Sequence, residues 1–173
     1  MKKNLVLTGM MGVGKTTIGK ILAKKLKLKF VDTDKIIQIK EKSTIKKIFE
    51  DKGESYFRNI EKKTTLEELK KKNLVMALGG GAFIDASIRR EIKISCISFW
   101  LDLKLESLLT RLKNATKRPL IDQNNLERSI NKIYSERKKI YSKSNFRIKC
   151  NTMNKNEIVY KIIELYENPG NKI

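Results

Sequence analysis

A glycine-rich segment near the start of the chain has the residue types needed to hold phosphate. Residues 9–16 read GMMGVGKT and match the pattern G-x-x-x-x-G-K-[ST] at every fixed position. Glycines let a backbone approach an anion closely, and the positive end of a following helix favours the negative charge. Lys15 can reach the β- and γ-phosphates, and the Thr16 hydroxyl can bind Mg²⁺. The backbone amides expected to face the phosphates are those of Gly12, Val13, Gly14, Lys15, Thr16 and Thr17.

A chance glycine-rich turn is the alternative explanation of this segment. The segment lies between an apolar stretch at 4–8, which predicts a strand, and an amphipathic stretch at 15–27, which predicts a helix. That context is the one in which the motif binds nucleotides, so phosphate binding is the favoured interpretation.

Two aspartates, Asp32 and Asp34, follow the second predicted strand directly. Ligands of open α/β sheets bind at the carboxyl ends of the strands, so both carboxylates should face the phosphate-binding segment. Phosphoryl transfer needs a carboxylate near Mg²⁺ and a group that orients or deprotonates the acceptor hydroxyl. The two aspartates could divide these duties. Alternatively, they only stabilise a turn or cap a helix, positions at which Asp is common.

Several arginines occupy positions at which a charge needs a partner. Arg137 falls on the apolar stripe of the predicted helix 126–141, four residues after Ile133. A guanidinium that points inward is costly unless it meets an anion. Arg58 lies three residues before Glu61, a spacing at which the two can orient each other. Arginine suits bidentate binding of a carboxylate, although both could form ordinary structural ion pairs.

A polar segment at 113–124 holds Arg118 and lies between two predicted helices. Such a segment could serve as a lid that brings Arg118 onto the transferring phosphate. Arg111, on the preceding helix, could stack on the base of a nucleotide. The alternative is an ordinary solvent-exposed loop, an explanation that suits Arg111 better than Arg118.

Apolar periodicity predicts alternating strands and helices along the chain. Strands are expected at 4–8, 29–31, 74–78, 94–101 and 146–149. Helices are expected at 15–27, 35–41, 44–49, 54–72, 85–91, 105–112, 126–141 and 156–166. This alternation predicts an α/β fold with a parallel sheet covered on both faces. With 173 residues and no repeat or linker, one domain over residues 1–173 is expected.

The composition restricts the chemistry that the chain can perform. Histidine is absent, so catalysis must use carboxylates, Lys, Arg and backbone amides. Cys96 and Cys150 have neither metal-site nor redox spacing, which is typical of reduced thiols in a cytoplasmic protein. No apolar run is long enough for a membrane span, and the first apolar segment is too short for a secretory signal.

The formal net charge is +20, from 39 basic and 19 acidic residues. A basic surface could bind nucleic acid. The lysines are scattered, however, and usually fall on the polar side of the helical patterns, which favours a solvated surface without nucleic acid.

Taken in order, the motifs resemble those of the shikimate kinase family across nearly the whole chain. Beyond residues 9–23 and 30–34, the resemblance rests on Ile45, Ile48, Phe49, Gly53, Glu54, Phe57, Arg58, Glu61, Gly79, Gly80, Gly81, Arg118, Pro119, Leu120, Glu136, Arg137 and Tyr141. It implies ATP- and Mg²⁺-dependent phosphorylation of the 3-hydroxyl of shikimate, a step towards chorismate and the aromatic amino acids. It also implies a P-loop, nucleoside-monophosphate-kinase-like three-layer sandwich with a central five-stranded parallel sheet flanked by helices and a mobile lid.

The resemblance also implies a role for each site residue. Arg58 and Arg137 would hold the carboxylate of shikimate, and Asp34 would act as base and hold hydroxyls together with the Gly79–Gly81 backbone. Thr16 and Asp32 would support Mg²⁺. The remaining assignments are Lys15 and Arg118 at the transferring phosphate and Arg111 near adenine. Residues 151–156, where the adenine-contacting loop of the family should lie, carry no readable motif.

Two rival functions remain open on the sequence. Another small-molecule kinase on the same scaffold, of the gluconate type, would share the phosphate-binding segment but would have no special need for paired carboxylate-binding arginines. A nucleic-acid-binding protein with an incidental phosphate loop would fit the charge but not the lack of a basic stripe. We expect a monomer with ATP and a small molecule as its ligands.

Overall fold

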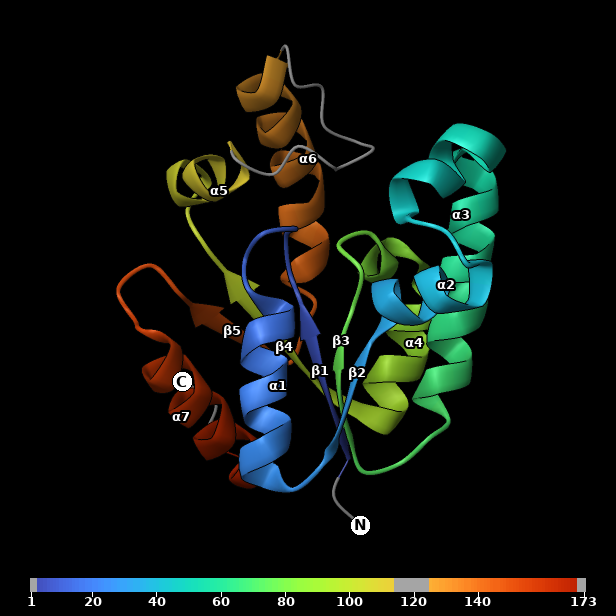
Figure 1. Ribbon diagram of the computed structural model, residues 1–173. Coiled ribbons are helices and arrows are strands. Elements are labelled where there is room, and N and C mark those ends of the chain that lie inside the picture. Colours follow the sequence, from blue (N-terminus) through green and yellow to red (C-terminus); the bar gives the residue numbers. More distant parts are fainter. Residues whose placement is uncertain (1–2, 114–124, 171–173) are drawn as a thin grey trace.

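Five parallel strands form the centre of the molecule in the computed structural model, which describes residues 3–113 and 125–170 (Figure 1). Their order in the sheet is β2-β3-β1-β4-β5, and every pair of neighbours is parallel. The strands are β1 (Asn4–Thr8), β2 (Lys29–Asp32), β3 (Leu74–Ala77), β4 (Cys96–Asp102) and β5 (Phe146–Lys149). The predicted five-stranded parallel sheet is therefore confirmed.

Helices cover both faces of this sheet (Figure 1). The helices are α1 (Lys15–Leu26), α2 (Thr33–Glu41), α3 (Ile45–Leu69), α4 (Ala86–Ser95), α5 (Leu105–Leu112), α6 (Leu126–Tyr141) and α7 (Lys155–Glu167), with a short 3-10 helix, η1 (Ala82–Ile84). Helices α1 and α7 pack side by side on one face, and α4, backed by α3, packs on the other. The predicted three-layer α/β sandwich is confirmed, whereas residues 114–124 of the predicted lid lie outside the described residues.

The strand sequences explain why the sheet is central. Every residue of β1 and β3 is buried, as expected for parallel strands that are covered on both faces. Leu5, Leu7 and Val75 have no solvent exposure, and burying each such side chain contributes about 1.5–3 kcal/mol. The edge strands β2 and β5 keep exposed residues, so the hydrophobic core is thickest beneath β1 and its two neighbours.

Most predicted boundaries are within three residues of the observed ones, but the predicted boundary between α4 and β4 is wrong in a way that has a physical reason. The strand expected at 94–101 begins only at Cys96, because Ile94 and Ser95 still belong to α4. The Ser95 hydroxyl donates to the Glu91 carbonyl at 2.9 Å, which extends the helix, and Ile94 is 64% exposed. Ile94 therefore belongs to the last turn of α4, although the apolar run at 94–101 predicted that it would begin a strand.

A break at Gly53 divides α3 into two segments, as the separate predicted helices 44–49 and 54–72 indicate. Gly53 has φ 79° and ψ 171°, a conformation open to glycine but not to other residues. Ile37 of α2, Ile48 of the first segment and Phe57 of the second segment pack together. These three side chains form a small cluster separate from the main core.

Among residues 3–113 and 125–170, none of the helices combines the length and apolar character required to cross a lipid bilayer.

A substitution at Gly9 tests the close packing at the end of β1. Gly9 has φ +132°, and a Cβ there would lie 2.5 Å from the Leu101 carbonyl oxygen, a backbone atom that cannot swing away. Gly9→Ala should therefore lower the free energy of unfolding by about 1–3 kcal/mol in urea denaturation. Gly170→Ala is the control, because a Cβ there meets no described atom within 4 Å. Equal stability of the two variants would contradict the packing argument.

Candidate active site

The loop between β1 and α1 curls around the ammonium of Lys15. Gly9, Gly12 and Gly14 all have positive φ, at 132°, 78° and 105°. Lys15 is the first residue of α1, and its Nζ donates to the carbonyls of Gly9 at 2.8 Å and Met10 at 2.9 Å. The loop thus has the glycine geometry and helix N-terminus of an anion site, with a buried cation at its centre.

Thr16 and Asp32 lie together beside this loop. The Thr16 hydroxyl donates to Asp32 Oδ2 at 2.7 Å, and Asp32 Oδ1 accepts from the amide of Lys35 at 3.3 Å. Asp32 is therefore the N-cap of α2, as the alternative interpretation predicted, and it is also a partner of Thr16. A hydroxyl and a carboxylate oxygen fit Mg²⁺, which binds few protein oxygens and keeps water and phosphate oxygens. Within the described residues no group of three or more Asp, Glu, Cys or His side chains forms a larger metal site.

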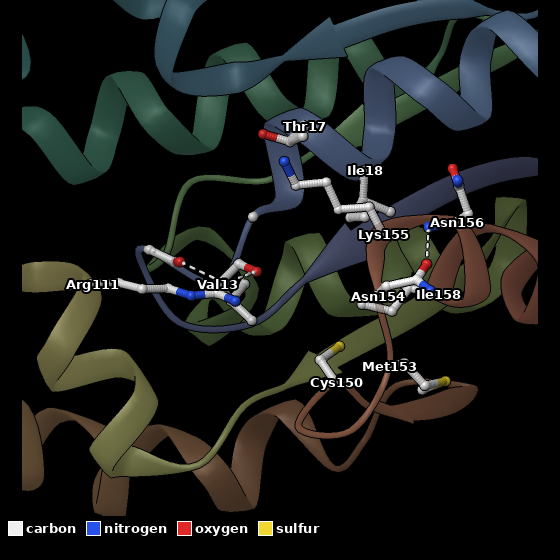
Figure 2. Close-up of a pocket in the computed structure, with 12 residues that line it drawn as sticks. Val13, Thr17, Ile18, Arg111, Cys150, Met153, Asn154, Lys155, Asn156 and Ile158 are labelled. Atoms are coloured by element: carbon white, nitrogen blue, oxygen red, sulfur yellow. Dashed lines mark hydrogen bonds between the residues drawn. The ribbon is translucent and has the colours of Figure 1, made fainter.

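A hollow of about 700 Å³ opens on the outer side of the glycine loop (Figure 2). Arg111 reaches across its mouth, where Nη1 donates to the carbonyl of Val13 at 3.2 Å. The opposite wall consists of Cys150, Met153, Asn154, Lys155, Asn156 and Ile158. The hollow is continuous with the phosphate loop and is large enough for the base and sugar of a nucleotide.

The resemblance placed an adenine-contacting loop at residues 151–156, but sequence reasoning did not identify Met153 and Asn154 as the residues of this wall. The available signal was the spacing of Asn154 and Glu157, which predicts a capping box at a helix start. In the structure the Asn154 side chain accepts from the amide of Glu157 at 3.1 Å, and Glu157 accepts from the amide of Asn154 at 2.6 Å. The last helix therefore begins at Lys155, one residue before its predicted start, and its N-terminus faces the hollow.

The glycines after β3 allow charged side chains to approach the backbone. A Cβ on Gly79 would collide with Asp34 Oδ1 and would lie 2.7 Å from Glu61 Oε1. A Cβ on Gly81 would collide with the guanidinium of Arg58. The amide of Gly79 donates to the Thr33 hydroxyl at 2.8 Å, which fixes the loop to the start of α2. Glycine is required at positions 79 and 81 because the charged side chains of Asp34, Glu61 and Arg58 occupy the space that a Cβ would need.

The two predicted arginines meet in this cluster from different helices. Arg58, on α3, donates to Glu61 Oε2 at 2.7 Å and to Glu54 Oε1 at 2.9 Å. Arg137, on α6, is only 7% exposed, and its Nη1 donates to the carbonyl of Gly80 at 3.0 Å. The inward orientation predicted for Arg137 is thus confirmed.

Two adjoining hollows share these side chains. The smaller also contains Asp34, Met11 and Phe57, and both are lined by Arg58, Glu61, Gly81 and Arg137. A cavity that holds two guanidinium groups and an aspartate suits a small anionic molecule that also carries hydroxyl groups.

The smaller hollow, which is called the acceptor cavity from here on, adjoins the phosphate loop directly. A Cβ on Gly80 would lie 3.5 Å from the amide nitrogen of Met11 and 3.6 Å from Arg137 Nη1. The structure therefore brings the predicted residues of the loop, the aspartates and the arginines to one edge of the sheet. Arg118 lies outside the described residues.

Glu61 is a buried carboxyl in this cluster, with 3% of its surface exposed. Burial raises its pKa above the ordinary glutamate value, Arg58 opposes that rise, and the nearby Asp34 carboxylate adds to it. Two carboxylates and two guanidinium groups thus share one small volume, and their charges depend on one another.

Comparison with known proteins agrees with this geometry. The family model described as shikimate kinase matches residues 11–167. A shikimate kinase of Sulfurihydrogenibium sp. (strain YO3AOP1) is 44% identical over 93% of this chain and 96% of its own length. The chain belongs to the shikimate kinase family. A shikimate kinase of Persephonella marina is 42% identical, again over 93% of this chain and 97% of its own length.

A solved structure supports the assignment to the shikimate kinase family. The shikimate kinase from Acinetobacter baumannii, in complex with shikimate, superposes with a TM-score of 0.93 at 34% identity, covering 99% of this chain and 97% of that one. The resemblance inferred from the sequence motifs is therefore confirmed.

The pH dependence of stability tests the buried state of Glu61. Because its folded-state pKa is raised, its contribution to stability is complete below the unfolded pKa and is lost as pH rises through the folded pKa. Glu61→Gln should remove that decline, as measured by urea unfolding at several pH values from about 4 to 8.

Glu68→Gln is the matched control for this experiment, since Glu68 is also buried on α3 but pairs with Lys71 instead of Arg58. The control should keep the wild-type pH profile. A Glu61→Gln variant with an unchanged profile would show that the carboxyl is not buried as described.

Proposed function

We propose that this protein transfers the γ-phosphoryl group of ATP, with Mg²⁺, to the 3-hydroxyl of shikimate. The observation that carries the proposal is the position of Gly80, which lies between the phosphate loop at Met11 and the guanidinium of Arg137. A phosphate donor on one side and a carboxylate-bearing acceptor on the other would meet at this glycine. Family membership supports the same reaction.

On the donor side, the residues of the loop bind and neutralise the triphosphate. Lys15, whose Nζ donates to the carbonyls of Gly9 and Met10, would contact the β- and γ-phosphates. Thr16 and Asp32 would hold Mg²⁺, which neutralises charge that develops on the phosphate oxygens. Arg111 lines the base and sugar hollow, and Arg118 is proposed to reach the phosphates from the segment 113–124.

On the acceptor side, Arg58 and Arg137 bind the carboxylate of shikimate. Glu61 holds Arg58 in place, and the Gly80 carbonyl holds Arg137, so little reorganisation is needed on binding. Asp34 stands beside Gly79 and is the proposed base, which orients the acceptor hydroxyl and receives its proton as the new O–P bond forms. Positioning of the two substrates in line then provides most of the rate enhancement.

We also propose that the protein acts as a cytoplasmic monomer on these two small molecules and does not bind nucleic acid. Cys96 and Cys150 are free, buried thiols, which suits a reducing compartment. Scattered surface lysines account for the high charge without a binding stripe.

A coupled assay of ADP release tests the reaction. MgATP is supplied with shikimate, with gluconate or with no acceptor, and the product is identified by mass spectrometry. We expect release with shikimate only, and one shikimate 3-phosphate per ADP. Release with gluconate alone would support the rival kinase, and no acceptor-dependent release would overturn the proposal.

Replacement of Lys15 tests the donor side of the proposed site. Lys15→Met should lower kcat by about 100-fold or more, because it removes the cation from the phosphates. Lys20→Met is the matched control, since Lys20 lies on the same helix and is exposed. Full turnover by the Lys15 variant would contradict the assignment of the loop.

Replacement of Arg137 tests the acceptor side. Arg137→Ala should raise KM for shikimate roughly 10- to 100-fold and change KM for ATP little, because it removes one carboxylate-binding charge. Arg128→Ala, an exposed arginine on the same helix, should leave both constants unchanged. Steady-state kinetics with each substrate varied in turn would measure both effects.

A further inference from the structure

Tyr141 is a buried residue beside the acceptor cavity, and neither the sequence analysis nor the proposed mechanism gives it a role. It ends α6, is 1% exposed, and its hydroxyl donates to the carbonyl of Gly80. The same hydroxyl oxygen lies 4.0 Å from Met10 Sδ in the phosphate loop. The phenol thus reaches from α6 to the point at which the two substrate sites adjoin.

The Gly80 carbonyl accepts from two side chains of one helix. Arg137 Nη1 donates to it at 3.0 Å, and Tyr141 follows Arg137 by four residues on α6. Residues four apart lie on one face of a helix, so both donors arrive from the same direction. A carbonyl oxygen has two lone pairs, and here α6 supplies a donor to each.

The Gly80 carbonyl fixes the positions of both the Gly81 amide and the Arg137 side chain. A peptide group is planar, so a fixed Gly80 oxygen also fixes the direction of the Gly81 amide. Gly81 in turn packs against the guanidinium of Arg58. On the other side, the Gly80 oxygen accepts from Arg137 Nη1, and Arg137 also lines the cavity.

The hydroxyl and the ring of Tyr141 have separable roles. The ring packs against Trp100, with centroids 6.2 Å apart, and belongs to the main core. Burial raises the pKa of the hydroxyl, and Arg137 opposes that rise. A phenol has an ordinary pKa of about 10 and is therefore protonated at neutral pH, so the hydroxyl is available as a donor.

We propose that Tyr141 is a positioning residue for acceptor binding. Its hydroxyl fixes the Gly80 carbonyl, and this carbonyl holds Arg137 in the orientation that receives the carboxylate of the acceptor. This inference rests on the proposed function, since it assigns a part in the binding of shikimate. Tyr141 does not touch the reacting atoms, and it acts through Gly80 and Arg137.

Tyr141→Phe tests the inference, because it removes the hydroxyl and keeps the ring in the core. The Gly80 carbonyl retains Arg137 as a donor, so the folded state keeps a partner for this buried oxygen. KM for shikimate should rise about three- to tenfold, the effect of one buried hydrogen bond, with kcat and KM for ATP changed less than about twofold.

Tyr166→Phe is the matched control. The Tyr166 hydroxyl also donates to a backbone carbonyl, that of Lys3, at 2.6 Å, but lies on α7 away from the acceptor cavity. Both variants should lose similar stability in urea, whereas only Tyr141→Phe should change KM for shikimate. An equal change of KM in both variants, or a fall of kcat without a change of KM, would overturn the positioning role.

A double variant separates positioning from other effects on the site. If Tyr141 acts through Arg137, adding Tyr141→Phe to Arg137→Ala should raise KM for shikimate by less than about twofold more. A full additional three- to tenfold rise would overturn the route through Arg137. Wild-type turnover with shikimate is measured first: its absence would overturn the proposed function and this inference with it, whereas turnover with an unchanged KM in Tyr141→Phe overturns the inference alone.

Discussion

The site depends on the parallel pairing of β1 with β3, in which Leu5 faces Val75 and Leu7 faces Ala77. The chain leaves β1 through α1 toward β2 on one side, and leaves β3 through α4 toward β4 on the other. Connections that depart in opposite directions open a crevice at the carboxyl ends of the two strands. The phosphate loop and the three-glycine loop flank this crevice, so the strand order itself brings donor and acceptor together.

The crevice can hold charged groups away from water because their charges are balanced. Asp34 and Glu61 lie near Arg58, Glu61 pairs with Arg58, and Arg137 is held by a carbonyl. Burying any one of these ions alone would be costly, so removing its partner would lower the stability of the folded state. In the proposed function the carboxylate of the ligand would meet the two guanidinium groups within this cluster.

Local features of the site could be predicted from the residues alone, whereas the grouping of Asp34, Arg58 and Arg137 came only from the resemblance and other long-range contacts were not predicted. The phosphate loop is contiguous in the chain, and its glycines and Lys15 therefore have a recognisable spacing. Asp32 and Asp34 follow from their place after a strand. The bond between Tyr141 and Gly80 joins residues 61 positions apart and depends on how α6 packs against the sheet. Ile94 shows the limit of periodicity, since an exposed apolar residue at a helix end resembles the start of a buried strand.

The two sides of the site rest on different clusters of buried side chains. Ile37 of α2, Ile48 before Gly53 and Phe57 after it form the small cluster, whereas the phosphate loop rests on the main core. A segment with few buried contacts opens at a lower free energy than the sheet does. Local opening of α2 would carry Asp34 away, so the acceptor side of the proposed site would be lost before the phosphate loop unfolds.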